Sequence, residues 1–123
     1  VGNMTLYDDG GKRVDSFWYT TGNSGVTNQS TPNQGPIPLG NYSFNVGDIS
    51  ATNFIRNQLG DWGQFRVTLT PSISTNTFGR TGFFIHGGKR DGSAGCIDVG
   101  NADTTLFDKV KAMCKGSVSL TVR

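Results

Sequence analysis

Apolar and polar residues alternate in several segments of the chain, and this alternation is the period of a β-strand. The pattern predicts a β-hairpin in which residues 4–7 and 14–19 flank a glycine-containing turn. The same period, or a short apolar run, predicts further strands at 42–46, 65–70, 83–86 and 118–122. The strand at 83–86 is expected to lead into a glycine-rich loop.

Helical spacing of apolar residues is confined to residues 102–114. Asn101 or Asp103 is expected to cap the start of this helix, and Gly116 is expected to end it. The sequence therefore predicts one C-terminal helix packed on a sheet.

Three segments show neither the strand period nor the helix period of apolar residues. Residues 20–34 are polar and predict a long loop, and residues 35–40 (Gly-Pro-Ile-Pro-Leu-Gly) predict a rigid turn. Residues 51–59 are compatible with either a helical turn or an irregular loop.

Composition supports the mainly β prediction. The chain has 123 residues, which suits a single domain spanning residues 1–123. Glycine contributes 18 residues and glutamate none. An all-helical bundle is improbable without glutamate, and metal or catalytic motifs that need a glutamate carboxylate are excluded.

Charge and hydropathy exclude further classes. The formal net charge is only +2 and the basic residues form no run, so a nucleic-acid partner is not expected. The longest apolar run is the three residues 83–85, too short for membrane insertion. One His and two Cys cannot supply a four-ligand zinc site, and no metal or other cofactor is expected.

The segment from His86 to Cys96 holds the candidate chemistry. The sole His ends an apolar strand, and Cys96 follows after a run of small residues. A nucleophilic thiol needs a base, because a free thiol is mostly protonated at neutral pH, and it needs N–H groups that face the developing oxyanion. Three other interpretations stay open: Cys96 and Cys114 form a disulfide, Cys96 is a buried and unreactive thiol, or His86 is a structural strand-end residue.

Two blocks in this region resemble a known family. Ile85-His86-Gly87 followed by Ser93-Ala94-Gly95-Cys96-Ile97 is similar to the signature of the L,D-transpeptidases, cysteine enzymes of peptidoglycan. The segment from Gly35 to Tyr42 and the C-terminal helix and strand also resemble that family, so the likeness covers residues 35–123. It implies a β-sandwich or barrel.

Two departures from the family pattern indicate a divergent branch. Ala94 stands where the motif has a His, and Asp98 stands where an Arg or Asn is usual. These features resemble the compact type VI secretion effectors that attack the peptidoglycan of rival bacteria.

The resemblance implies roles for single residues. Cys96 would be the nucleophile and His86 its base, oriented by Ser93 or by a carbonyl near Gly87. The N–H groups of Gly95 and Cys96 would form the oxyanion hole. The candidate substrate-binding residues are Arg80, Lys89, Arg90 and Asp98. For the three cations, solvated loop charges are an equally open interpretation.

The resemblance also implies a biological setting. The substrate would be the tetrapeptide stem of peptidoglycan, which loses its terminal D-alanine by hydrolysis or exchanges it for an amine. The enzyme would be a monomer with a cognate immunity protein, secreted by a non-classical route to act in the periplasm of a target bacterium. The alternatives are an L,D-transpeptidase that remodels the producer's own wall, a disulfide-stapled wall-binding β domain without activity, and a nuclease toxin.

Overall fold

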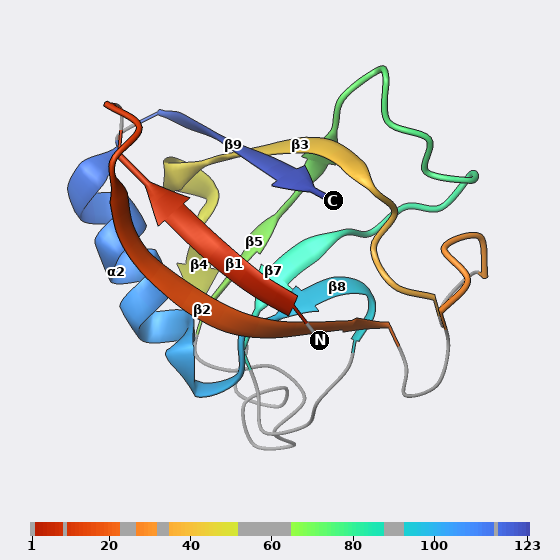
Figure 1. Ribbon diagram of the computed structural model, residues 1–123, viewed down its shortest axis with the longest axis horizontal. Coiled ribbons are helices and arrows are strands. Elements are labelled where there is room, and N and C mark those ends of the chain that lie inside the picture. Colours follow the sequence, from red (N-terminus) through yellow and green to blue (C-terminus); the bar gives the residue numbers. More distant parts are fainter. Residues whose placement is uncertain are drawn as a thin grey trace.

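Two β-sheets face each other across the core, and one helix closes an end of the sandwich (Figure 1). The prediction of a mainly β fold with a C-terminal helix is confirmed. The computed structural model describes residues 2–8, 10–22, 27–31, 35–51, 65–87, 93–114 and 116–123.

The larger sheet has six strands in the order β1-β2-β8-β7-β5-β4. Neighbouring strands are antiparallel except for β7 and β8, which run parallel. The strands are β1 (Gly2–Tyr7), β2 (Arg13–Gly22), β4 (Ser50–Ala51), β5 (Phe65–Thr68), β7 (Phe84–His86) and β8 (Ser93–Asp98).

The predicted N-terminal hairpin is formed by β1 and β2. Its turn is held by Asp8, whose Oδ1 accepts hydrogen bonds from the N–H groups of Gly10 (3.0 Å) and Lys12 (2.9 Å). Gly11 follows at φ +81°, a conformation that glycine adopts without a steric cost.

The smaller sheet has three strands in the order β6-β3-β9, namely β6 (Thr70–Pro71), β3 (Gly40–Asn45) and β9 (Ser117–Val122). A short 3₁₀ turn, η1 (Val46–Asp48), follows β3. The single strand predicted at 65–70 is divided, because β5 pairs with β7 in the large sheet whereas β6 pairs with β3 in the small one. Leu69 stands between them and is buried.

The helix α2 (Asp103–Met113) follows a 3₁₀ turn, η2 (Gly100–Ala102). Neither predicted cap is present: Ala102 is the N-cap residue and makes no side-chain cap hydrogen bond. The carboxylate of Asp103 instead accepts the N–H of Phe65 from strand β5. The helix ends at Met113, ahead of the predicted Gly116, because the chain must become extended to enter β9.

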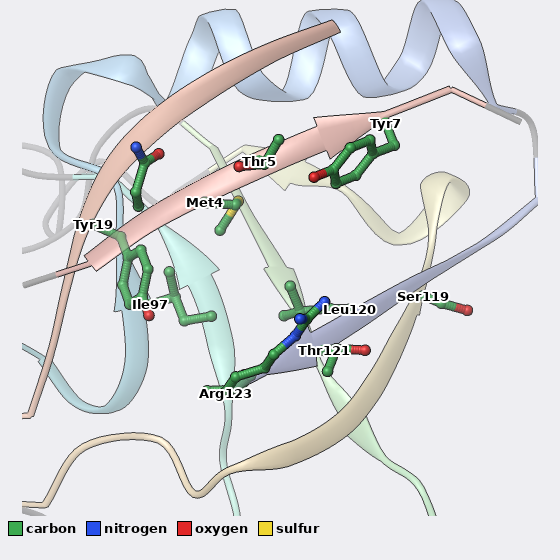
Figure 2. Close-up of a pocket in the computed structure, with 11 residues that line it drawn as sticks. Met4, Thr5, Tyr7, Tyr19, Ile97, Ser119, Leu120, Thr121 and Arg123 are labelled. Atoms are coloured by element: carbon green, nitrogen blue, oxygen red, sulfur yellow. The ribbon is translucent and has the colours of Figure 1, made fainter. Parts of the chain in front are cut away.

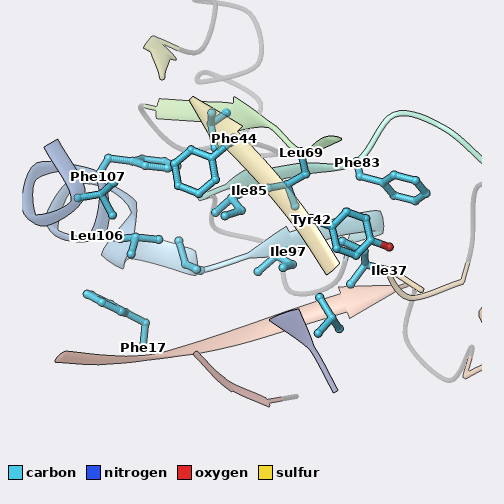
Figure 3. Packing of buried hydrophobic residues seen from close by; sticks show 14 residues of the cluster. Phe17, Ile37, Tyr42, Phe44, Leu69, Phe83, Ile85, Ile97, Leu106 and Phe107 are labelled. Carbon is cyan, nitrogen blue, oxygen red and sulfur yellow. The ribbon is translucent and has the colours of Figure 1, made fainter. Parts of the chain in front are cut away.

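Among the described residues, 14 buried apolar side chains form the core between the sheets. Figure 3 shows Leu106 and Phe107 of α2 at one end of it, and Tyr42 and Phe83 at the other. Ile85 of β7 and Ile97 of β8 also belong to this core. Because side chains alternate along a strand, the neighbours of Ile85 and Ile97 must point to the opposite face of the large sheet.

The predictions for the three segments without apolar periodicity, 20–34, 35–40 and 51–59, are confirmed only in part or lie outside the described residues. The loop predicted at 20–34 starts later than expected, because residues 20–22 belong to β2, and its parts at 23–26 and 32–34 lie outside the described residues. The rigid turn at 35–40 contributes a carbonyl, that of Pro38, which accepts the hydroxyl of Tyr42 at 2.7 Å. Of the segment 51–59, Ala51 lies in β4 and the rest is outside the described residues.

Candidate functional site

His86 and Cys96 lie on neighbouring parallel strands of the large sheet. In the register of β7 and β8, Ile85 is opposite Ile97 and His86 is opposite Asp98. Cys96 therefore stands two residues before the partner of His86. Since Ile85 and Ile97 face the core, His86 and Cys96 share the other face of the sheet. The topology brings the two sequence candidates together on one surface.

His86 is held tightly at the end of β7. It is 1% exposed, and its carbonyl accepts the N–H of Val99 at 2.9 Å. Its Nδ1 lies 2.7 Å from the carbonyl oxygen of Gly87, which is one of the contacts expected from the sequence. A carbonyl accepts but does not donate, so this contact requires the proton on Nδ1, and the neutral imidazole then carries its lone pair on Nε2.

Cys96 is 5% exposed and lies inside strand β8. The sequence predicted that it ends a glycine-rich loop. The structure places residues 93–96 in the strand, where Ser93 pairs with Gly22 of β2 and the following residues Ile97 and Asp98 pair with β7. Its Sγ lies 3.8 Å from the carbonyl oxygen of Gly82.

The two cysteines do not form a disulfide. Both Cys96 and Cys114 are free thiols, the first buried and the second partly buried. Cys114 follows the last residue of α2, and its Sγ faces the carbonyl of Ser117 at 3.7 Å. The disulfide-stapled alternative therefore has no support in the structure.

Gly87 is closely packed by the turn that starts the helix. A Cβ atom on Gly87 would lie 2.5 Å from the carbonyl oxygen of Gly100, and 2.6 Å and 2.7 Å from Cγ and Cβ of Asp103. Asp98, just before this turn, accepts the N–H of Gly100 through Oδ1 at 2.8 Å. The backbone beside His86 is thus fixed by residues 98–103.

A row of polar residues crosses the large sheet through His86. The pairing register places Thr20 opposite Asp98, Asp98 opposite His86, His86 opposite Arg66, and Arg66 opposite Ser50. In-register neighbours present their side chains on the same face. Sequence reasoning missed Arg66 as a site residue, although the alternation in 65–70 already separated it from the core residues Val67 and Leu69.

Arg80, a predicted substrate-binding residue, has a structural role. It is 8% exposed, and its guanidinium donates hydrogen bonds to three backbone carbonyls. The carbonyls belong to Gln29, Pro36 (2.7 Å) and Gly35 (2.9 Å). These bonds fasten the segment before β3, and they use three of the five N–H donors of a side chain that was expected to bind a carboxylate of the substrate.

The remaining candidates are only partly located. Lys89 and Arg90 lie outside the described residues. Ser93 and Gly95 are in strand β8, of which only the backbone is described at these positions. Asp98 is 3% exposed and lies beside His86, so it faces the same surface as the candidate base.

A separate cleft of about 480 Å³ opens between the edge strands β1 and β9. Figure 2 shows Tyr19, Ile97 and Leu120 among the residues that line it. Ile97 points away from the face that holds Cys96, so this cleft lies on the other side of the sheet. The pair His86 and Cys96 is not part of it.

The described residues offer neither a metal-binding cluster nor a membrane-spanning helix. No three His, Cys, Asp or Glu side chains in this part of the chain gather closely enough to hold a metal ion. The helices among these residues are too short or too polar to cross a membrane.

Comparison with known proteins places the chain in a family. The family model described as the Tlde1 domain matches residues 21–121, most of the chain, so the chain belongs to the Tlde1 domain family. It is accordingly a type VI secretion effector domain. No curated protein sequence matches the chain.

Proposed function

We propose that this Tlde1-family domain is a cysteine peptidoglycan enzyme that removes the terminal D-alanine of tetrapeptide stems, or exchanges it for an amine. The observation that carries the proposal is the placement of His86 and Cys96 on one face of adjacent strands. The contact of His86 Nδ1 with the Gly87 carbonyl supports it, since that contact leaves Nε2 as the proton acceptor.

The proposed reaction proceeds through a thioester. His86 Nε2 takes the thiol proton of Cys96, and Sγ attacks the carbonyl carbon of the third stem residue. The amide bond to the terminal D-alanine then breaks, and its amine leaves with the proton from the imidazolium. Water hydrolyses the thioester and restores the thiol, which yields a tripeptide stem. An amine acceptor, such as a free D-amino acid, forms a new amide instead.

The two proposed catalytic residues are buried. His86 and Cys96 are both almost completely buried, and electrostatic interactions are stronger where water is excluded. The N–H groups of Gly95 and Cys96 are proposed to hold the oxyanion. The carbonyl of Gly87 plays the part that a carboxylate plays in a Ser-His-Asp triad, which is to fix the tautomer and orientation of the imidazole.

Substrate recognition is proposed to rest on positive charge near His86. Arg66 carries a guanidinium on the same face, one strand from His86. Lys89 and Arg90 stay predicted contacts to stem carboxylates, and Ser93 and Asp98 stay predicted site residues. Arg80 is removed from this set because its donors are bound to backbone carbonyls.

Family membership supports the proposed setting. An effector that attacks tetrapeptide stems acts in the periplasm of the target bacterium, where peptidoglycan is exposed. The cell that makes it then needs a cognate immunity protein.

The two cysteines provide a matched test of the nucleophile. Purified variants Cys96→Ala and Cys114→Ala are incubated with tetrapeptide muropeptides, and the products are analysed by mass spectrometry. We expect tripeptide formation to be abolished in Cys96→Ala and retained in Cys114→Ala, because only Cys96 shares with His86 one face of the large sheet. Turnover by Cys96→Ala near the wild-type rate would contradict the proposal.

A second variant tests the base. His86→Ala is expected to lower the rate by about 10²–10⁴-fold, the usual contribution of a positioned acid–base group. His86 is the only imidazole in the chain, so no other His replaces it. An unchanged rate and pH profile would assign His86 a structural role only.

A further inference from the structure

Asp103 is a buried carboxylate that the proposed chemistry does not use. It is 4% exposed and is the first residue of α2. Burial of a charged side chain is unfavourable unless specific interactions offset the loss of water. Asp108, on the same helix, is exposed to solvent.

The side chain of Asp103 connects two strands of the large sheet to the helix. Its Oδ2 accepts the backbone N–H of Phe65, in strand β5, at 3.2 Å. Its Cβ and Cγ press against Gly87, directly after strand β7, as the distances of 2.7 Å and 2.6 Å from a Cβ built on Gly87 demonstrate. Asp103 therefore fixes the position of Gly87 relative to β5.

Gly87 in turn fixes the imidazole of His86. The carbonyl of Gly87 is the acceptor 2.7 Å from Nδ1. Any rotation of the peptide plane at Gly87 moves this oxygen and weakens the bond that selects the Nδ1–H tautomer. The contacts thus run without a gap from Phe65 through Asp103 and Gly87 to His86.

We infer that Asp103 is a positioning residue, which holds the Gly87 carbonyl where it keeps His86 in the Nδ1–H tautomer, with the lone pair of the imidazole on Nε2. The inference rests on the proposed function for its catalytic meaning. The tautomer itself is a property of the folded protein and is measured without substrate.

Three substitutions at Asp103 separate shape from hydrogen bonding. Asp103→Asn keeps the shape and retains an oxygen that accepts the N–H of Phe65. Asp103→Ala removes both the acceptor and the Cγ contact. Asp103→Ser removes the carboxylate and leaves a single hydroxyl at the γ position, in a residue that favours helix starts. Asp108→Ala is the matched control, because it removes an exposed carboxylate from the same helix.

The first readout is the ¹⁵N NMR spectrum of the imidazole, which needs no assignment because the chain has one His. We expect the Nδ1–H tautomer in the wild type, Asp103→Asn and Asp108→Ala. In Asp103→Ala and Asp103→Ser we expect a mixture of tautomers. Circular dichroism checks that each variant is folded before its spectrum is interpreted.

The second readout is steady-state kinetics on tetrapeptide stems. We expect kcat of the Ala and Ser variants to fall about 10-fold or more with KM little changed, since a misplaced base affects proton transfer more than binding. Asp103→Asn should stay within about threefold of the wild type.

The outcomes separate the inference from the proposed function. A wild-type tautomer and kcat in folded Asp103→Ala or Asp103→Ser overturn the inference alone. Loss of the fold in both variants also overturns it and assigns Asp103 a structural role. If the wild type has no activity on stems but the tautomer changes as expected, the proposed function fails and the positioning of His86 by Asp103 stands.

Discussion

Replacement of Gly87 by alanine is expected to lower the free energy of unfolding by about 3 kcal/mol, near the upper end of the usual cost of overpacking. The added Cβ would lie 2.5 Å from the carbonyl oxygen of Gly100 and within 2.7 Å of two Asp103 atoms. Real Cβ atoms essentially never come closer than 3.0 Å to such neighbours. Something must therefore move.

Neither neighbour of Gly87 moves easily. Gly100 would meet the added Cβ through its backbone carbonyl oxygen. It lies in the turn η2, where it adopts φ +62° and donates its N–H to Asp98. Asp103 is buried and is bound to the N–H of Phe65. Relief of the clash must break one of these hydrogen bonds or displace the start of α2, and that is why the expected cost is large.

Urea unfolding followed by circular dichroism measures the effect, with Gly116→Ala as the matched control. A Cβ on Gly116 meets nothing within 4 Å, and its φ is not in the left-handed region. Gly116→Ala is thus expected to be neutral or to stabilise by about 0.5 kcal/mol, through the lower entropy of the unfolded chain. If Gly87→Ala is as stable as this control, the close packing of Gly87 against Asp103 is refuted.

The remaining predictions concern stability away from the site. Burial raises the pKa of Tyr42 to about 12 from 10.0, so the stability that this tyrosine contributes is complete below pH 10 and is lost between pH 10 and 12. The melting temperature should therefore fall less steeply between pH 10 and 12 in Tyr42→Phe than in the wild type. Arg80→Lys should lower the free energy of unfolding in urea by about 2 kcal/mol, because one ammonium cannot replace a guanidinium that bonds to three carbonyls; an unchanged midpoint would contradict the structural role of Arg80. Phe78 is exposed at φ +56°, so Phe78→Asn should raise the free energy of unfolding by about 1 kcal/mol, and a lower melting temperature would argue against backbone strain there.

The sequence by itself determined the elements that depend on local pattern. Alternation identified the hairpin, β3 and β9, and helical spacing located α2 to within a residue at each end. These patterns can be recognised in the sequence because each strand or helix buries one face, so apolar residues recur at the period of that element. The sequence also isolated His86 and Cys96, since the chain offers one imidazole and places one of its two thiols ten residues later.

Only the tertiary structure decided which residues meet. The parallel pairing of β7 with β8 puts His86 and Cys96 on one face, and Arg66 joins them from β5. Asp103 looked like a helix cap, yet it binds Phe65, 38 residues away. Arg80 looked like a surface cation, yet it is buried among carbonyls. Such contacts join segments that are distant along the chain, and no local period encodes them, because strand pairing depends on how the whole chain buries its core.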